Sequence, residues 1–456
     1  MERTVQTNLS GSLFTSLPED VFTVVEAQMS VLIEYINSSD LVATEAGDSL
    51  LIYGLLSILR GLWCKQTNFR NSLLLDLESN IAAANDFLRM IEKVDNFIHR
   101  TAQNYPHLPW TENKGEVSAV RREAADLISL LGGDAVHAAQ QVAAFVMRAV
   151  LRSDVPTKLF SRDWEDRFVQ NEVVVSMVRL FEGYLSDIHN WVDQDFLYHK
   201  VVVALVRSSV CFYLRCLVKK ADQIRRSKRR LGMGNKRAGY QVFVSPSRAM
   251  CRMSYDIEVL RDYFHSVAKE NVALGRVVAN ELSVLVVIFE CMWLAVGKTG
   301  ADSLDEFIVV VHKRTGADAD VTKHFLSDLW LLMAPSGDQH VIQSALIGIS
   351  AELKLVSARM KEKDANSPWK ANDNGFVGLR LDEMLKSLYE DRILQERTSL
   401  CGNILTNVKE LREGNRNRTD SFGEPKPFDS ADLREKIKGT VKFDHLRKYL
   451  GTREVS

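Results

Sequence analysis

The stretch from Leu159 to Lys220 constrains the fold most, because it predicts two long helices in succession. The first has acidic residues near its start. The second begins near Asp195 and carries no acidic residue before Asp222. Apolar residues recur along one broad face of this second helix, with basic residues interspersed. Long helices with so little turn chemistry between them are typical of helical bundles and leave few clefts for catalysis.

Proline is rare enough to favour long helices elsewhere too. The chain of 456 residues has nine prolines, and none lies between Pro156 and Pro246 or between Pro246 and Pro335. Because proline removes a backbone donor and clashes with the preceding turn, such spans suit uninterrupted helices. An apolar content of 46% is enough to fill the core of two or three domains, or of one extended array of packed helices.

Helical periodicity recurs along most of the chain, and no stretch alternates as a strand would. Ser16 with Glu19 is a capping-box pattern that predicts a helix start, and Ser245 followed by Pro246 predicts another. Besides the helix near 195, we expect helices at about 16–33, 41–63, 71–99, 115–152, 163–188, 250–267, 272–296, 302–313, 319–333, 338–361, 379–411 and 431–450.

The predicted fold class is therefore all-α, an elongated rod of stacked helical bundles. Breaks in the pattern suggest four parts. They are an N-terminal bundle at 1–110, a middle bundle at 111–240 that ends in a basic loop, a C-terminal bundle at 241–412, and a flexible tail with a short helix at 413–456.

The sequence carries no convincing catalytic motif. No P-loop, zinc-protease, hydrolase-elbow or EF-hand pattern occurs, and Gly232-Met233-Gly234 follows a helix, where a phosphate-binding loop would follow a strand. Asp318 and Asp320 with His324 fit helix caps better than metal ligands. We therefore expect no enzyme, no cofactor, no metal and no small-molecule substrate.

Terpene cyclases deserve separate exclusion, because they are also all-helical and bind magnesium through carboxylate motifs. The nearest match is Asn85-Asp86. The second motif of that class needs a hydroxyl at position 89 and an acid at position 93, where this chain has Arg89 and Lys93. Those two positive charges would repel the metal.

The N-terminus, the apolar runs, the cysteines and the tryptophans predict where the protein is located and which residues pack in its core. The N-terminus lacks the apolar core of a secretory signal, and charges interrupt the most apolar runs, so we expect a soluble cytosolic protein. The six cysteines form no metal-binding pair, which predicts buried, reduced thiols. Trp164, Trp191, Trp293 and Trp330 are expected to be packing anchors.

A basic segment between two predicted helices is the one chemically distinctive feature. It sets nine positive residues against Asp222 alone: Lys219, Lys220, Arg225, Arg226, Lys228, Arg229, Arg230, Lys236 and Arg237. A solvated loop, a contact with anionic lipid or an acidic partner, and a nuclear-import signal all fit this composition. Nucleic acid is disfavoured, since no aromatic residue is interleaved before Tyr240.

Three motifs stand out in the middle of the chain: Leu159-Phe160-Ser161-Arg162-Asp163-Trp164, Phe181-Glu182-Gly183-Tyr184-Leu185-Ser186-Asp187-Ile188 and Asp195-Phe196-Leu197-Tyr198-His199-Lys200. They resemble the C-terminal helical region of exocyst subunits of the Sec-six type, the exocyst component three family. Ala84-Asn85-Asp86 is similar to an alanine-asparagine motif in an early helix of that family. The resemblance covers roughly residues 15 to 410, and its motifs are diffuse helical patterns.

The resemblance implies the CATCHR-like architecture of tethering complexes. It also implies a non-catalytic tethering or scaffold subunit in exocytosis, which binds other exocyst subunits and fusion machinery to hold vesicles at the plasma membrane. Such a protein would be cytoplasmic and peripheral at the plasma membrane or at secretory vesicles. The chain is shorter than a full subunit, so we expect a fragment or a truncated paralogue. A helical adaptor unrelated to trafficking, or an all-helical metal-dependent enzyme, are the alternatives.

Overall fold

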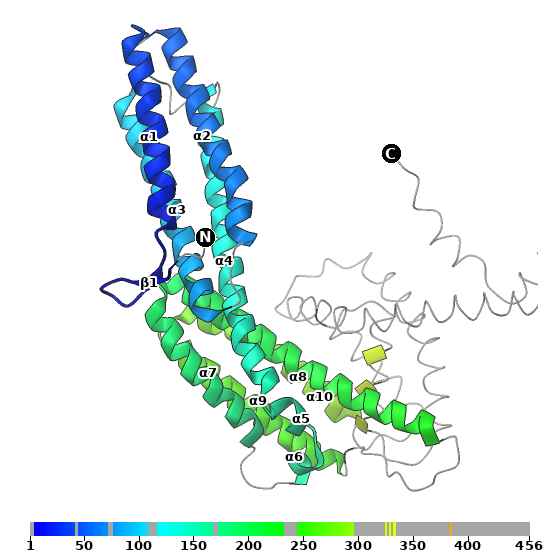
Figure 1. The fold of residues 1–456 in the computed structure, drawn as a ribbon. Coiled ribbons are helices and arrows are strands. Elements are labelled where there is room, and N and C mark those ends of the chain that lie inside the picture. The colour runs from blue at the N-terminus through cyan, green and yellow to red at the C-terminus, as the bar shows by residue number, and fades with distance from the viewer. Residues whose placement is uncertain are drawn as a thin grey trace, which may run out of the picture. The chain divides into compact units, whose positions relative to one another are not determined.

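The computed structural model describes residues 4–41, 44–71, 76–106, 108, 116–166, 172–231, 243, 245–295, 324–325, 328–329, 332–333 and 384 (Figure 1). All of them belong to the first of the two compact units of the chain, Met1–Leu388. Helices dominate these residues, and the predicted all-α helical-bundle fold is confirmed.

Ten helices and one small hairpin make up the described elements. The strands are β1 (Gln6–Thr7) and β2 (Leu13–Phe14). The helices are α1 (Leu17–Ser38), α2 (Glu45–Asn71), α3 (Leu77–Asn104), α4 (Glu116–Arg152), α5 (Val155–Lys158), α6 (Arg162–Asp166), α7 (Glu172–Trp191), α8 (Asp195–Leu231), α9 (Pro246–Val267) and α10 (Val272–Ala295).

Helices α1 to α4 form a first packed group, in which α1 and α4 each contact both α2 and α3. The apolar stripe of each helix faces the interior of the group. Leu51, Leu55 and Leu59 of α2 are almost fully buried, as are Ile81 and Val94 of α3. This spacing of three to four residues is the one from which the sequence predicts these helices.

Helix α4 belongs to two groups, as Figure 1 shows. Its first half lies against α2 and α3, where Arg60 of α2 pairs with Glu123. Its second half lies against α8, where the Ser209 hydroxyl approaches the sulfur of Met147 at 4.0 Å. Ala138 and Ala143, both fully buried, are small enough to let neighbouring helices come close. Shared packing along one uninterrupted helix therefore links the two groups.

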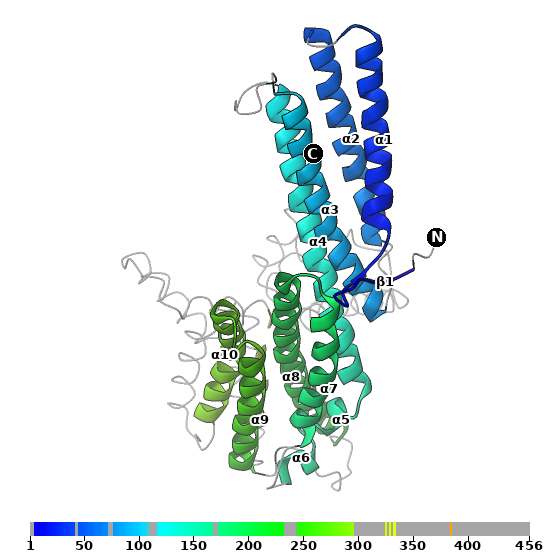
Figure 2. The ribbon, with the colours of Figure 1, turned by 90° about the vertical axis from the view of Figure 1, so that its left-hand side faces the viewer.

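The second group consists of the later half of α4 with α7, α8, α9 and α10, which lie side by side in Figure 2. Helix α8 contacts α4, α7 and α10, and α9 contacts α7 and α10. Leu197, Leu205 and Leu217 of α8 are buried, as are Phe181 of α7 and Phe264 of α9. The second of the two long predicted helices is thus an inner helix of this group.

Part of the expected basic loop is helical. Helix α8 continues to Leu231, so residues 219 to 231 lie in the helix. The reason is local: no glycine or proline occurs between Asp195 and Leu231, and Lys and Arg are good helix formers. Positive charge near a helix C-terminus also interacts favourably with the helix dipole. Like-charge repulsion between residues three or four apart in a helix is too weak to overcome these preferences.

The two predicted helix caps behave differently. Ser245 caps α9 as expected, since its side chain accepts a hydrogen bond from the N–H of Arg248. Ser16 precedes α1, but its hydroxyl makes no cap bond and donates to Asp20. The capping box with Glu19 is therefore wrong, although the helix start is right. Thr15 accepts the N–H of Leu17 in its place.

Of the helix predicted at 163–188, the structure describes α6 and α7, and residues 167–171 between them lie outside the described part. Three further expectations need correction. The β1–β2 hairpin departs from the expectation that no stretch forms a strand, because two-residue strands leave no alternation to detect. Cys64 and Cys251 are exposed although buried thiols were expected, and Trp293 is 56% exposed although it was expected to anchor packing. Helix ends and outer helix faces account for these departures.

Other expectations lie wholly or partly outside the described residues. These are the helices at 302–313, 338–361 and 431–450, the tail from 413, Trp330, Asp318 and Asp320. From the predicted helices at 319–333 and 379–411, only residues 324–325, 328–329, 332–333 and 384 are described, all helical. The four-part division at 110, 240 and 412 stays a prediction.

Candidate functional site

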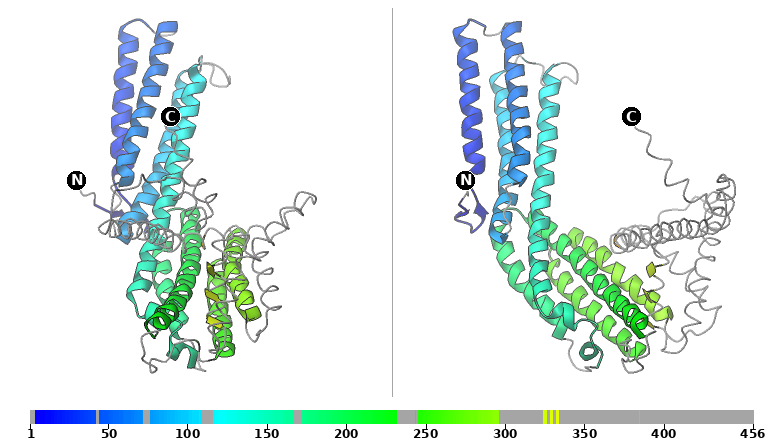
Figure 3. Two further views of the ribbon diagram at one scale, coloured as in Figure 1. Left: turned by 90° about the vertical axis from the view of Figure 1, so that its right-hand side faces the viewer. Right: turned by 45° about the vertical axis from the view of Figure 1, so that its right-hand side comes forward.

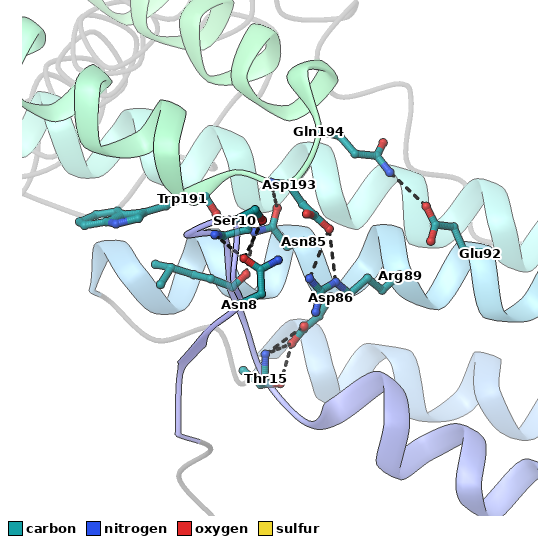
Figure 4. A network of polar contacts seen from close by, with 12 residues as sticks. Asn8, Ser10, Thr15, Asn85, Asp86, Arg89, Glu92, Trp191, Asp193 and Gln194 are labelled. Atoms are coloured by element: carbon teal, nitrogen blue, oxygen red, sulfur yellow. Dashed lines mark hydrogen bonds and ion pairs between the residues drawn. The ribbon is translucent and has the colours of Figure 1, made fainter.

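A buried asparagine on α3 is the centre of the polar network drawn in Figure 4. The side chain of Asn85 is fully buried. Its amide nitrogen donates to the backbone carbonyl of Leu13 at 2.7 Å and to that of Trp191 at 2.9 Å. Its amide oxygen accepts the N–H of Asp193 at 3.0 Å. One side chain therefore binds the N-terminal hairpin and the turn between α7 and α8 at once.

The next residue, Asp86, holds the start of α1. Its carboxylate accepts the backbone N–H of Thr15 at 3.1 and 3.2 Å and the Thr15 hydroxyl at 2.6 Å. Thr15 in turn accepts the N–H of Leu17, the first residue of α1. Charge-assisted hydrogen bonds of this kind are roughly twice as strong as neutral ones. Asp86 therefore fixes where α1 leaves the hairpin, although α3 carries the carboxylate.

Partly exposed charges surround these two buried residues. Arg89 pairs with Asp193 at 3.3 Å, and its guanidinium lies 4.5 Å from the centroid of the Phe14 ring. Lys93 pairs with Glu19 of α1 at 2.7 Å. Exposed ion pairs contribute little to stability, so these pairs serve mainly to orient the segments around the buried core of the network.

The hairpin reaches this network through a tight turn. The side chain of Asn8 accepts the N–H of Ser12 at 2.8 Å and the hydroxyl of Ser10 at 2.7 Å. Gly11 has a φ of +91°, and a Cβ at that position would lie 3.5 Å from the carbonyl oxygen of Asn190. Glycine is required there because other L-residues rarely adopt this conformation. Asn8, Ser10 and Gly11 are residue types common in turns, but they do not by themselves predict the two short strands.

We name the buried pair and its partners, namely Asn85, Asp86, Leu13, Thr15, Trp191 and Asp193, the polar junction. Both buried side chains are engaged by groups of the protein itself. Arg89 and Lys93, where a magnesium-binding motif would need a hydroxyl and an acid, lie in ion pairs. The geometry suits a joint that holds three segments in register.

A second buried cluster lies among α6, α8 and α9. Asp256 is fully buried, and one carboxylate oxygen accepts hydrogen bonds from Trp164 Nε1 and the Tyr213 hydroxyl, each at 3.0 Å. The ring of Phe160 packs edge-on against both aromatic residues. Burial, and secondarily the negative charge of Asp256, hold the pKa of Tyr213 well above its usual value. This cluster therefore fixes α6 and α9 on α8, and Trp164 is the packing anchor expected from sequence.

Lys220, one of the nine predicted surface residues, is not on an exposed surface. It is 8% exposed, and its ammonium lies 5.8 Å from the centroid of the Phe243 ring. Burial lowers the pKa of Lys220, and the nearby Glu165 partly counters this effect. Glu165 also accepts the backbone N–H of Ser245, the cap of α9. Lys220 therefore belongs to the packing of α8 against the start of α9.

The other predicted basic residues lie further along α8 or beyond it. Lys219 is exposed. Arg225, Arg226, Lys228, Arg229 and Arg230 lie in the last turns of α8, and their side chains fall outside the described part of the structure. Lys236 and Arg237 lie outside the described residues altogether. The helix thus places the five residues from 225 to 230 within less than two turns of one another.

An ion pair that sequence reasoning missed joins α8 to α10. The Arg207 guanidinium donates two hydrogen bonds to one oxygen of Glu281, at 2.7 and 3.0 Å. The Glu281 side chain is fully buried, while that of Arg207 is 35% exposed. Both residues lie in strongly apolar runs. A charged residue within such a run indicates a buried charge that needs a partner, and this was the signal for the ion pair.

Two described helices are long and apolar enough to cross a membrane by length and composition alone, over Asp195–Gln223 and Val272–Glu290. Both pack against neighbouring helices, and inner helices of water-soluble bundles meet the same criterion. The Arg207–Glu281 pair lies between them. The described residues contain no group of three or more His, Cys, Asp or Glu side chains that could hold a metal ion.

Comparison with solved structures supports the resemblance seen in the sequence. The chain is similar to a structure described as the crystal structure of the C-terminal domain of the exocyst subunit Sec6p, with a TM-score of 0.51 and 12% identity. The match covers 81% of this chain and 86% of that one. No protein-family model and no curated protein matches the sequence. At this identity the similarity shows a shared helical-bundle fold and does not distinguish one subunit from another.

Proposed function

We propose that the protein is a non-catalytic tethering or scaffold subunit in exocytosis, which binds other exocyst subunits and fusion machinery at the plasma membrane or at secretory vesicles. The observation that carries the proposal is the fold shared with an exocyst subunit domain over 81% of the chain. The sequence motifs around Trp164, Phe181 and Asp195 led to the same family independently of the structure.

The contacts of the described helices support a binding role. The polar junction and the Asp256 cluster use their polar groups to hold helices together, and they lie in the interior. Helices fixed in this way present long side-chain surfaces, and surface shape and charge then supply the activity. The protein would work in the cytoplasm, peripherally at membranes.

The test is affinity purification of the tagged protein from its native cytosol, followed by mass spectrometry. We expect several exocyst subunits to be enriched over a purification with the tag alone. The Asn85→Ala/Asp86→Ala variant should recover fewer subunits than the wild-type protein, because the polar junction no longer holds its segments. Enrichment of other proteins without any exocyst subunit would favour a helical adaptor unrelated to trafficking.

We further propose that the basic end of α8, together with Lys236 and Arg237 further along the sequence, contacts anionic lipid or an acidic partner. The residues of the helix itself are Lys219, Arg225, Arg226, Lys228, Arg229 and Arg230. Lys220 is left out because it is buried. Each basic residue near an anionic membrane contributes about 1 kcal/mol. Replacing the five residues from 225 to 230 with glutamine should therefore weaken sedimentation with phosphatidylserine liposomes while the circular-dichroism signal stays unchanged. Equal sedimentation of the two proteins would reject the lipid contact.

A further inference from the structure

The outer face of α1 carries an apolar stripe that none of the described helices covers. Val24, Val31 and Tyr35 are 56%, 67% and 58% exposed, and Ala27 is also exposed. These positions follow one another at spacings of three to four residues, so they lie along one side of the helix. Single exposed apolar residues are ordinary on protein surfaces, but four in helical register on one helix are not.

The packing of α1 explains why this side is open. Helix α1 contacts α2 and α3 and lies at the edge of its group in Figures 2 and 3. Phe22, Val25, Met29 and Ile36 form its buried face. The exposed stripe lies about two fifths of a turn around the helix from that face, by the rotation of about 100° per residue. The helix is therefore apolar on two separate sides, of which the bundle uses one.

Charge indicates what kind of partner the open side would accept. Between Leu17 and Ser38 the chain has four acidic residues and no Lys, Arg or His. Glu19 and Glu26 pair with Lys93 and Arg100 of α3. Asp20 and Glu34, both exposed, lie beside the stripe. Glu34 also lines a shallow depression of about 530 Å³ together with Ser30, Ile33, Asn37 and Ser38.

We propose that α1 is a docking surface for an amphipathic helix of another protein, one with an apolar stripe flanked by Lys or Arg. The partner's apolar residues would cover Val24, Ala27, Val31 and Tyr35, in the way that the a and d positions of two helices meet in a coiled coil. Its basic residues would lie beside Asp20 and Glu34 and select it over an acidic helix. This surface involves neither the polar junction nor the basic end of α8.

The probe is a synthetic peptide of four heptads with Ile at a, Leu at d and Lys at e and g, whose like charges discourage self-association. Its binding to the purified full-length chain is measured by fluorescence anisotropy. We expect saturable one-to-one binding. A matched peptide with Glu in place of every Lys should bind at least tenfold more weakly, and the Glu34→Lys variant should bind the Lys peptide less tightly than the wild-type protein does.

The decisive variant is Val24→Gln/Val31→Gln/Tyr35→Gln, which removes the exposed stripe and keeps good helix formers. It should bind the Lys peptide at least tenfold more weakly while its circular-dichroism spectrum is unchanged. The control is Tyr53→Gln/Val272→Gln, which removes exposed apolar residues elsewhere and should bind as the wild-type protein does. Absence of saturable binding, or equal binding by the stripe variant, would overturn the proposal. Exocyst subunits are not present in this assay. A negative result would therefore not bear on the exocytic proposal, which is tested separately by affinity purification.

Discussion

Asn85 donates a hydrogen bond to the backbone carbonyl of Trp191 over 2.9 Å, and this contact joins α3 to the end of α7 across more than a hundred residues of sequence. The same amide nitrogen binds Leu13 in the hairpin. Helices packed only through apolar side chains can slide or rotate with a small loss of packing free energy. A buried amide has its hydrogen bonds satisfied in only one arrangement of the helices. The polar junction therefore determines the register in which the two helix groups meet.

The Asn85→Ala variant should be destabilised by about 2–4 kcal/mol, because it leaves two carbonyls and one N–H without their buried partner. Urea denaturation followed by circular dichroism measures this change. Asn104→Ala is the matched control on the same helix, since Asn104 is exposed and its removal should change stability by less than about 0.5 kcal/mol. Equal midpoints for the two variants would show that the junction is unimportant.

Thr15 and Asp86 should be energetically coupled. Thr15→Val removes the hydroxyl that donates to Asp86 and accepts from Leu17, and Asp86→Ala removes the carboxylate. A double-mutant cycle in urea should return a coupling energy of about 1.5–3 kcal/mol, as expected for a hydrogen bond to a charged group. Additive effects of the two substitutions would contradict the contact.

The Arg207–Glu281 pair yields a prediction in which the double variant is better than the single one. Arg207→Met should cost about 2–3 kcal/mol, because Glu281 keeps its charge in a buried position without the guanidinium. We expect less than for a fully buried pair, since Arg207 is partly exposed. Arg207→Met/Glu281→Met should recover most of the loss, as thermal unfolding would show. A double variant less stable than Arg207→Met would refute this interpretation.

Cys216 should react slowly with alkylating reagents. Burial raises the pKa of its thiol from 9.0 to about 11, and only the thiolate reacts. Since each pKa unit is a factor of ten, the thiolate fraction at pH 8 falls about a hundredfold. Iodoacetamide treatment of the native protein, read by peptide mass spectrometry, should label the exposed Cys64 and Cys251 first. Labelling of Cys216 at the same rate would mean that the packing around α8 does not bury its thiol. Raising the pH toward 11 should speed its labelling.

Helix positions could be predicted from sequence where local chemistry decides them. Ser245 and Pro246 set the start of α9, and the absence of glycine and proline keeps α8 continuous. The hairpin could not be predicted, because Asn85 holds Leu13 of β2 and Asp86 holds Thr15 just after it, from more than seventy residues away. Nothing local signals contacts of that range.

The predicted basic surface illustrates a second limit. Lys220 was grouped with its neighbours because they are adjacent in sequence, but helix faces separate adjacent residues. Tyr213, Leu217 and Lys220 lie on one buried side of α8, while Lys219 points outward. Their spacing of four and three residues predicts a buried position for Lys220, whereas its positive charge predicts an exposed one. The spacing is the better guide here. Asn85 shows another limit. Its motif is visible in the sequence, but the residues that it contacts cannot be inferred from the sequence.

The most direct test of the exocytic proposal is a reciprocal purification, in which an endogenous exocyst subunit is captured and the recovered proteins are quantified by mass spectrometry. If the account is right, this chain is recovered with the captured subunit, and its amount falls when the Asn85→Ala/Asp86→Ala variant replaces it at equal expression. If the other exocyst subunits are recovered in full and the wild-type chain stays in the unbound fraction, the protein does not act as an exocyst subunit.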